Sequence, residues 1–162
     1  MSELMDFRIG QGFDLHRLRA GEGVHVGGVF IACEYAVEAH SDGDVALHAL
    51  CDALLGALAL GDIGQHFPDT DPNWAGADSR QLLRHVCALV RNTGYVPGNV
   101  DITVVAQRPR LAAHIPEMRA RIAQDLDIGM DHVSVKATTH EGVDAIGEKR
   151  AIAAHAVALV SR

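Results

Sequence analysis

Apolar residues recur at helical spacing in three segments of the chain. Residues 42–60, 78–92 and 115–126 each place them on one face of a helix. Ser41 precedes the first segment as the expected N-cap, and Gly61 follows it as a stop signal. We therefore predict three amphipathic helices in these ranges.

Segments rich in apolar and β-branched residues lie around the predicted helices. Residues 8–13 and 24–31 are typical of strands interrupted by glycine, and residues 100–106, 133–137 and 151–160 are typical of buried strands. Strands that alternate with helices indicate an α+β fold, a two-layer α/β sandwich. We expect a mixed four- to five-stranded sheet with helices on one face. The last strand is too apolar to leave one side in water, so another subunit is expected to cover the other face.

The length of 162 residues suits one domain with a substantial core and is too short for two. We expect a single domain over residues 1–162, with residues 1–7 as a flexible N-terminal tail. The net charge of −7 and the aromatic content of 4% argue against nucleic acid and anionic membranes as partners. Three widely spaced cysteines, with no apolar signal core, predict unpaired thiols and a cytoplasmic location.

A first group of candidate residues is the sequence Asp14-Leu15-His16. Residues two apart in a strand project to the same side, so Asp14 and His16 can converge while Leu15 points into the core. His48, near the start of the first predicted helix, can add a third ligand. One carboxylate and two imidazoles leave one tetrahedral position free, as in catalytic zinc sites. Since the chain has ten histidines, ordinary core or surface histidines are the alternative explanation.

Three further segments suggest phosphate chemistry, and each has a simpler structural explanation. Residues 40–44 precede a helix, where free amides attract phosphate, but capping also accounts for them. The long polar loop of residues 62–76 suggests a binding lid, although turn residues alone explain its composition. Residues 136–141 offer hydroxyls and a carboxylate for phosphate and a hard cation, or form an ordinary strand exit. Asp44 and Asp52 lie one turn from His48 and either orient its ring or are merely solvated.

Taken together and in this order, the motifs resemble the 2-C-methyl-D-erythritol 2,4-cyclodiphosphate synthase family of non-mevalonate isoprenoid biosynthesis. The resemblance covers residues 8–159, and its most specific stretches are residues 12–16, 39–52, 61–64, 67–71 and 136–139. It implies a phosphorus–oxygen lyase that cyclises 4-diphosphocytidyl-2-C-methyl-D-erythritol 2-phosphate and releases CMP. It also implies a homotrimer with active sites between subunits and the other sheet face packed at the trimer axis.

The resemblance implies a role for each candidate site residue. Asp14, His16 and His48 match the ligands of one Zn²⁺ per subunit, and Glu141 matches the ligand of Mg²⁺ or Mn²⁺ bridging substrate phosphates. His40 and Thr139 match positions that hold phosphate near the transition state, and these are the catalytic candidates. The residues expected to contact the substrate are Asp14, His16, His40, Ser41, Asp62, Ile63, Gly64, Phe67, Pro68, Asp69, Thr70, Asp71, Ala106, Gln107, Arg108, Pro109, Arg110, Leu111, Ala112, Thr138, Thr139, His140 and Glu141.

Within that set, the resemblance divides the substrate into two parts. Asp62 matches the residue that binds the methylerythritol hydroxyls, and residues 67–71 match a loop that closes over them. Residues 106–112 match the segment that holds cytidine. His140 stands where threonine is common in the family, and it is either an extra phosphate donor or a half-exposed bystander.

After Glu141 the chain departs from the family pattern. Some members carry Phe and Arg that line a trimer cavity for an isoprenoid diphosphate, whereas this chain has Ala145 and Glu148. That ligand site is therefore not carried over. The alternative is another placement of the gap, which brings Lys149 or Arg150 into the basic position. Two alternatives remain for the whole chain: another metal-dependent phosphohydrolase with an Asp-His-His site, and a non-catalytic trimeric binding protein with a structural metal.

Overall fold

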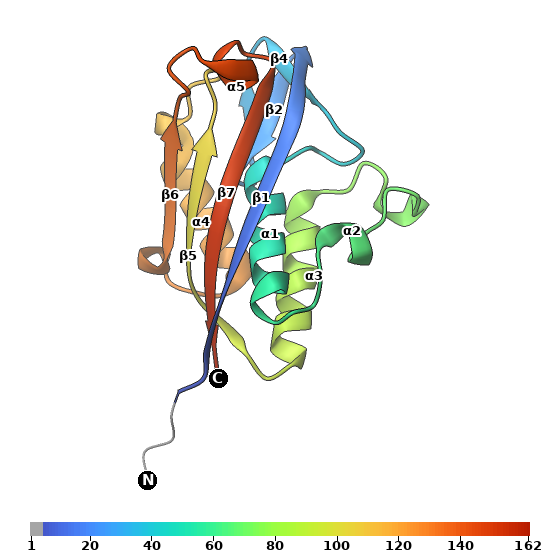
Figure 1. Ribbon diagram of the computed structural model, residues 1–162, viewed down its shortest axis with the longest axis vertical. Coiled ribbons are helices and arrows are strands. Elements are labelled where there is room, and N and C mark those ends of the chain that lie inside the picture. Colours follow the sequence, from blue (N-terminus) through green and yellow to red (C-terminus); the bar gives the residue numbers. More distant parts are fainter. Residues whose placement is uncertain (1–4) are drawn as a thin grey trace.

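In the computed structural model, which describes residues 5–162, five strands form one mixed sheet with the helices on one side (Figure 1). The strand order is β4-β1-β7-β5-β6, and only the β5–β6 pair is parallel within it. The strands are β1 (Phe7–Ala20), β4 (Tyr35–Glu38), β5 (Val96–Val105), β6 (Val133–Thr138) and β7 (Ala151–Ser161). The predicted α+β class and the mixed sheet with helices on one face are confirmed. Residues 1–4 of the expected tail lie outside the described residues, and Phe7 pairs with Ser161.

All three predicted helices are present. They are α1 (Val45–Ala57), α3 (Ser79–Asn92) and α4 (Ile115–Leu126), joined by the short helices α2 (Ile63–His66) and α5 (Asp144–Gly147) and the 3₁₀ turns η1 (Pro72–Trp74), η2 (Ala112–His114) and η3 (Met130–His132). The prediction of Ser41 as the N-cap of α1 is wrong. Asp44 is the N-cap, and its side chain accepts a hydrogen bond from the Leu47 amide at 3.0 Å. Several capping residue types precede this helix, and sequence spacing does not distinguish them.

Residues 24–31, predicted as one strand region, form a hairpin that is separate from the main sheet. Its strands are β2 (Gly23–Val26) and β3 (Val29–Ala32). Gly27 and Gly28 connect them with φ values of 63° and 81°, the left-handed conformation that a two-residue hairpin turn requires. The amides of both glycines donate to the Asp44 carboxylate at 2.9 and 2.8 Å, so the hairpin is tied to the start of α1.

Helix α1 packs directly against β1 at two glycines. A Cβ added to Gly10 would lie 1.8 Å from the carbonyl oxygen of Ala53, and one added to Gly12 would lie 1.8 Å from that of Ala49. No larger residue fits at these two positions without moving the helix backbone. Because alternate strand residues share a face, the next two positions on that face of β1, Asp14 and His16, lie alongside the first turns of α1.

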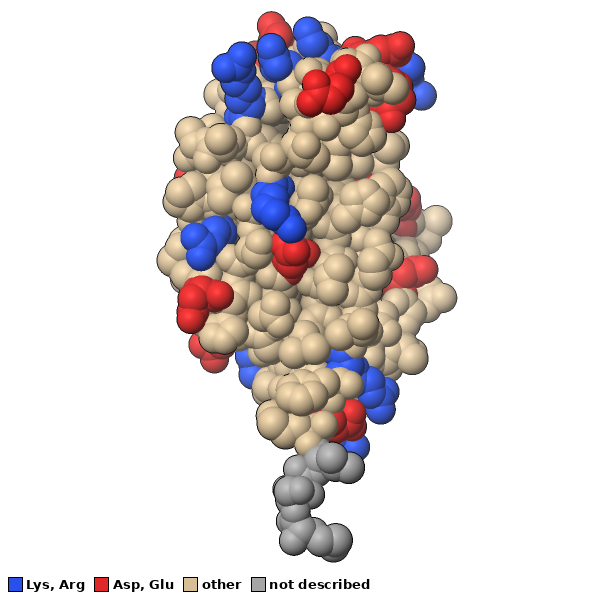
Figure 2. Space-filling model, turned by 60° about the vertical axis from the view of Figure 1, so that its left-hand side comes forward, with Lys and Arg blue, Asp and Glu red and all other residues tan. Residues whose placement is uncertain are grey.

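The opposite face of the sheet is exposed in the subunit. It is largely apolar along β1 and polar along β5 and β6, where Asp101 and Lys136 form an ion pair. Its exposed side chains on β1 and β7 include Phe7, Ile9, Phe13, Leu15 and Val157, at 46% to 71% of their full accessibility. The prediction that Leu15 points into the core is therefore wrong, because the core side of β1 carries Gly12, Asp14 and His16 instead. Figure 2 brings the β6 side of the molecule forward. Charged side chains of both signs gather at its upper end, and others are scattered across the rest of the face.

The cysteines are unpaired, as predicted. Cys51 and Cys87 are buried between α1 and α3, and burial raises the pKa of both thiols, that of Cys87 to about 12. They behave as small apolar core residues rather than as nucleophiles. Among residues 5–162, no helix has the length and apolar character needed to cross a bilayer.

Candidate active site

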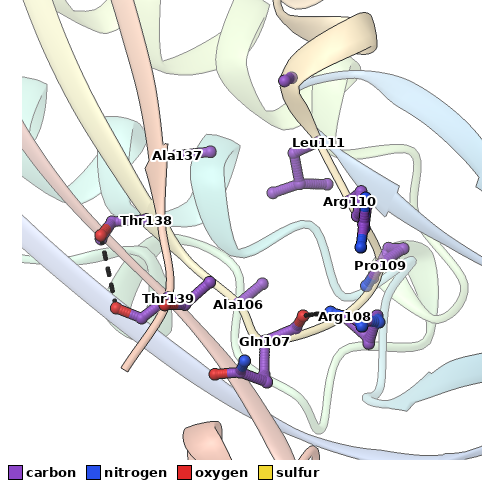
Figure 3. Close-up of a pocket in the computed structure, with 10 residues that line it drawn as sticks. Ala106, Gln107, Arg108, Pro109, Arg110, Leu111, Ala137, Thr138 and Thr139 are labelled. Atoms are coloured by element: carbon purple, nitrogen blue, oxygen red, sulfur yellow. Dashed lines mark hydrogen bonds between the residues drawn. The ribbon is translucent and has the colours of Figure 1, made fainter. Parts of the chain in front are cut away.

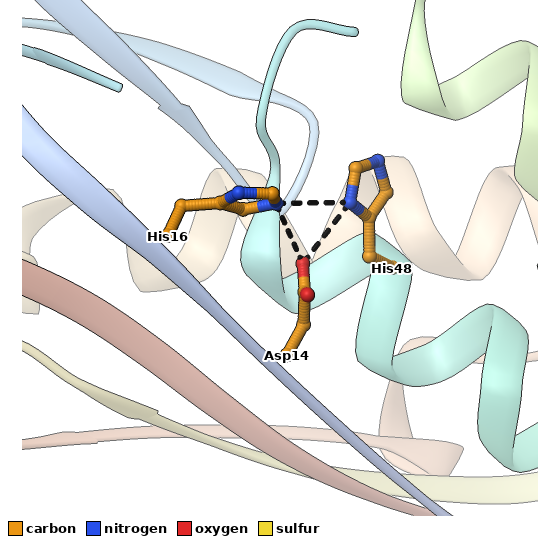
Figure 4. Close-up of side chains that lie close together, drawn as sticks. All are labelled: Asp14, His16 and His48. Atoms are coloured by element: carbon orange, nitrogen blue, oxygen red, sulfur yellow. Dashed lines mark hydrogen bonds and ion pairs between the residues drawn. The ribbon is translucent and has the colours of Figure 1, made fainter. Parts of the chain in front are cut away.

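Three potential metal ligands converge between β1 and α1 (Figure 4). The Asp14 Oδ2 atom lies 2.9 Å from His16 Nε2 and 3.0 Å from His48 Nδ1, and the two ring nitrogens are 3.5 Å apart. Ligands at about 2.0–2.1 Å from a tetrahedral zinc ion are about 3.3 Å from each other. The donor set and spacing therefore fit one cation with a free coordination position, and the predicted convergence is confirmed.

Asp14 and His48 shift each other's pKa. Burial alone would raise the pKa of Asp14, but hydrogen bonds and charge from His16 and His48 lower it below its ordinary value. Burial alone would lower the pKa of His48, but the hydrogen bond and charge of Asp14 raise it instead. A proton on His48 Nδ1 therefore balances Asp14 until a cation replaces it.

This exchange of proton for cation predicts a pH dependence. A raised pKa means that the His48–Asp14 pair stabilises the metal-free fold below about pH 6.5, and that this stabilisation is lost as the pH rises through the folded-state pKa. Above the folded-state pKa of His48, zinc no longer competes with a proton for the His48 ring. We expect zinc affinity to rise by up to about tenfold per pH unit for each imidazole proton displaced, until His48 is neutral. Chelator-competition titrations between pH 5.5 and 8.5 measure this, and a flat affinity profile would contradict it.

The Nε2 side of the His48 ring, opposite Asp14, faces hydroxyl groups. Its Nε2 atom lies 2.9 Å from Ser79 Oγ and 3.2 Å from Ser41 Oγ. Asp44, fully buried, uses its oxygens for the amides of the hairpin and of α1. Asp52 accepts a hydrogen bond from the Ile63 amide at 2.8 Å. The suggestion that Asp44 or Asp52 orients the His48 ring is not supported, because both carboxylates hold backbone amides.

A pocket of about 80 Å³ opens beside the cluster. Its lining residues are His40, Ser41, His48, Ile63, Gly64, Phe67, Asp69, Trp74 and Leu82. In the part of the chain that the structure describes, Asp62, Pro68, Thr70 and Asp71 are not among them. Asp62 caps α2 by accepting from the Gln65 amide, and Asp71 caps η1 by accepting from the Asn73 amide. The structure therefore brings part of the predicted loop to this pocket.

Sequence reasoning missed Trp74 and Leu82 in this pocket. The Trp74 ring packs edge-on against Phe67, with centroids 4.7 Å apart, and both rings contact His85 of α3. Trp74 is the single tryptophan of the chain and lies in a polar loop. A lone large aromatic residue among turn residues is a signal that could have identified it.

A second pocket, of about 330 Å³, lies at the ends of β5 and β6 (Figure 3). Its lining residues are Ala106, Gln107, Arg108, Pro109, Arg110, Leu111, Ala112, Ala137, Thr138 and Thr139. Residues 106–112, which were predicted to hold cytidine, thus line one pocket together with Thr138 and Thr139, whose hydroxyls were predicted to hold phosphate. His140 and Glu141 follow it on an exposed turn, where His140 Nδ1 lies 2.8 Å from Asp144 Oδ2. The structure does not bring Glu141 to the Asp14 cluster.

The two sites lie apart within one subunit. The strand register aligns Asp14 with Ala154, Ala154 with Val104, and Val104 with Ala137 across the sheet. Three inter-strand steps of about 4.8 Å separate Asp14 from Ala137 by about 14 Å. The cation cluster and the larger pocket therefore belong to different regions of the same sheet.

Comparisons with known proteins agree on one relationship. A family model described as the YgbB family matches residues 7–161. The 2-C-methyl-D-erythritol 2,4-cyclodiphosphate synthase of Ectopseudomonas mendocina is 60% identical over 153 residues, covering 94% of this chain and 98% of that protein. A solved structure of the bifunctional IspDF from Campylobacter jejuni matches with a TM-score of 0.93 and 39% identity, over 98% of this chain and 43% of that one. The Plasmodium falciparum IspF complex with CDP matches with a TM-score of 0.84 and 38% identity, over 95% of each chain.

Proposed function

The chain belongs to the YgbB family, and from this premise we propose that it is a phosphorus–oxygen lyase with the activity of its relative at 60% identity, a 2-C-methyl-D-erythritol 2,4-cyclodiphosphate synthase. The 2-phosphate of 4-diphosphocytidyl-2-C-methyl-D-erythritol 2-phosphate attacks the β-phosphorus of the same molecule. One P–O bond forms, the bond to the α-phosphate oxygen breaks, and CMP leaves. The convergence of Asp14, His16 and His48 beside a loop-covered pocket is the observation that carries this proposal.

Asp14, His16 and His48 would hold one Zn²⁺ per subunit. When bound, this ion supplies Lewis-acid polarisation of the β-phosphate and a fixed point for its orientation. The three side chains set where the ion would lie, and they leave it one position without a protein ligand. Glu141, on its exposed turn, would hold Mg²⁺ or Mn²⁺, which would neutralise phosphate charge. Cations of this kind let a chain of net charge −7 bind a polyanionic substrate.

The reaction requires no side-chain nucleophile, so the residues act by positioning and by hydrogen bonding. We assign His40 and Ser41, which line the pocket beside the cluster, to phosphate oxygens of the folded substrate. Thr139 would hold phosphate from the side of the larger pocket. Asp62 and the loop of residues 67–71 would contact the methylerythritol part. Phe67 and Trp74 add an apolar wall that excludes water, which would otherwise compete as nucleophile.

The larger pocket is assigned to the cytidine group. Its volume of about 330 Å³ and its lining by residues 106–112 suit a nucleobase, and the Plasmodium falciparum relative forms a CDP complex. We also propose a homotrimer in which the exposed apolar sheet face lies at the axis. Two observations support it: the exposure of Ile9 and Phe13, and the separation of about 14 Å between the cluster and the pocket of one subunit. A neighbouring subunit would then complete each active site.

The reaction product tests the proposed function. Purified protein is incubated with the substrate, Zn²⁺ and Mg²⁺, and the products are followed by ³¹P NMR. We expect CMP and an eight-membered cyclic diphosphate in equal amounts. An open-chain phosphate product would show that water is the nucleophile and would favour the phosphohydrolase alternative.

The Glu141→Ala variant tests the second cation. We expect it to retain zinc but to need a higher Mg²⁺ concentration for half-maximal turnover, by about tenfold, because one carboxylate ligand is lost. Glu148→Ala is the matched control, since Glu148 is an exposed glutamate nearby that pairs with Arg150. The measurement is turnover against Mg²⁺ concentration, and identical curves for Glu141→Ala and the wild type would refute the assignment.

A further inference from the structure

A chain of buried hydrogen bonds leads from the His48 ring to a carboxylate outside the metal cluster. His48 Nε2 lies 2.9 Å from Ser79 Oγ, and Ser79 Oγ is hydrogen-bonded to Asp42 Oδ1. Ser79 is fully buried and His48 is 6% exposed, so water does not compete for these bonds. Ser79 is the first residue of α3, and its amide also donates to Asp42, to Oδ2 at 2.9 Å.

The donors and acceptors along this chain determine which nitrogen of His48 carries hydrogen. Both oxygens of Asp42 accept hydrogen bonds from backbone amides, Oδ1 from Asp44 and Oδ2 from Ser79, so the single hydroxyl hydrogen of Ser79 goes to Asp42. Ser79 Oγ is then left to accept, and its partner must be an Nε2–H group of His48. Nε2 therefore keeps its hydrogen, and once a cation displaces the proton on Nδ1, the lone pair of Nδ1 faces Asp14 Oδ2 and His16 Nε2, where the cation is expected. Ser41 Oγ, at 3.2 Å, is a longer second neighbour of the same Nε2 atom.

We propose that Ser79 is a positioning residue for the metal site, fixing through Asp42 the tautomer and ring orientation in which His48 binds the cation by Nδ1. Neither Ser79 nor Asp42 is one of the three potential ligands, and neither lines the pocket beside them. The inference rests on the proposed function only in requiring that Asp14, His16 and His48 hold zinc.

Ser79 also lies close to the end of the loop of residues 62–76, which lines the pocket beside the Asp14 cluster. The Gly76 amide donates to the His40 carbonyl at 3.0 Å, and the Asp42 amide donates to the Ala77 carbonyl at 3.3 Å. The segment before α1 is thereby fastened to the segment before α3. Ser79 lies two residues after Ala77, so the end of the loop and the His48 ring are both held at the start of α3.

The test measures zinc affinity in the full chain, independently of turnover. Zinc dissociation constants are measured by competition with a chromophoric chelator, and thermal midpoints are recorded for the metal-free proteins. Ser79→Ala removes the acceptor for Nε2–H, and we expect zinc to bind about 10- to 100-fold more weakly. Ser79→Thr restores a hydroxyl and is expected to recover most of that affinity. Asp78→Ala is the control, since it removes the N-cap of α3 without touching His48, and it is expected to lower the midpoint but not the affinity.

The outcomes separate this inference from the proposed function. A wild-type protein that binds no zinc overturns the metal site itself. If the wild type binds zinc and Ser79→Ala binds it equally well, only the role of Ser79 is overturned. The same holds if Asp78→Ala loses as much zinc affinity as Ser79→Ala. It also holds if Ser79→Thr folds but binds zinc as weakly as Ser79→Ala. If Ser79→Ala does not fold, Asp42→Asn decides, because an amide can also donate and no longer forces the Ser79 hydrogen away from His48. Weaker zinc binding in Asp42→Asn then supports the inference, and unchanged binding overturns it.

Discussion

Replacing His48 with alanine is expected to abolish stable zinc binding and to lower kcat/KM by at least about 1,000-fold, equivalent to about 4 kcal/mol of transition-state stabilisation. The variant keeps Asp14 and His16 but loses the Nδ1 ligand that α1 supplies. Two ligands hold a tetrahedral zinc poorly, so the substrate loses both its charge stabilisation and its point of orientation. Elemental analysis of the purified variant and the rate of CMP release measure the two effects.

His132→Ala is the control for this experiment, because His132 is an exposed histidine beside Asp131, in η3. It is expected to keep both zinc and turnover. Circular dichroism and the oligomeric state of His48→Ala decide between enzyme and binding protein. A folded, assembled and inactive variant agrees with a catalytic metal. Loss of assembly on losing zinc would instead favour a structural metal, and full activity without zinc would refute the proposed mechanism.

Introducing arginine at Ile9 is expected to split the proposed homotrimer and to lower turnover by at least about 100-fold. Turnover falls because the two halves of each proposed active site belong to different subunits and would no longer be held together. Ile9 lies on the apolar sheet face and is 71% exposed in the subunit, so the subunit itself tolerates the change. Assembly would bury one guanidinium from each subunit without a partner, and burying unpaired charge is strongly unfavourable. Light scattering after size-exclusion chromatography gives the oligomeric state, and CMP release gives the turnover.

Met130→Arg is the matched control, because Met130 is an apolar residue of η3 that is 43% exposed and lies outside the sheet. We expect this variant to remain assembled and active. An Ile9→Arg variant that is monomeric yet fully active would show that one subunit contains a complete site. One that stays trimeric would show that a different surface forms the interface.

The helices were the most predictable part of the fold. Residues 115–126 and 78–92 have one apolar face and one charged face, so their periodicity predicts the observed bounds to within a residue. The orientation of β1 was not predictable in the same way. The exposed face of β1 carries larger apolar side chains than the face that α1 covers, so the alternation indicated the wrong side for the core. Leu15 was therefore assigned to the wrong face. The short elements β4, α2 and α5 carry too few residues to show a period.

The metal cluster was more predictable than its surroundings. Asp14 and His16 are close in sequence, and strand geometry alone places them on one side. His48 required the packing of α1 on β1, which the family resemblance implied and a single sequence does not show. The contact of Ser79 with His48 joins residues 31 positions apart at the starts of two helices. Ser79 also has an ordinary explanation as a residue at a helix start, so nothing in the sequence separates it from other serines.

The glycines at positions 10 and 12 give the metal site an unusual tolerance to change elsewhere. Main-chain atoms rather than interdigitating side chains determine how near α1 comes to β1, since Ala49 and Ala53 meet the glycines without bulk between them. Mutations that shrink leucines on the far side of α1 are therefore expected to weaken the fold before they alter the separation of the three ligands. Such spacing suits protein engineering, because the core can be redesigned for heat resistance while the coordination geometry is left intact.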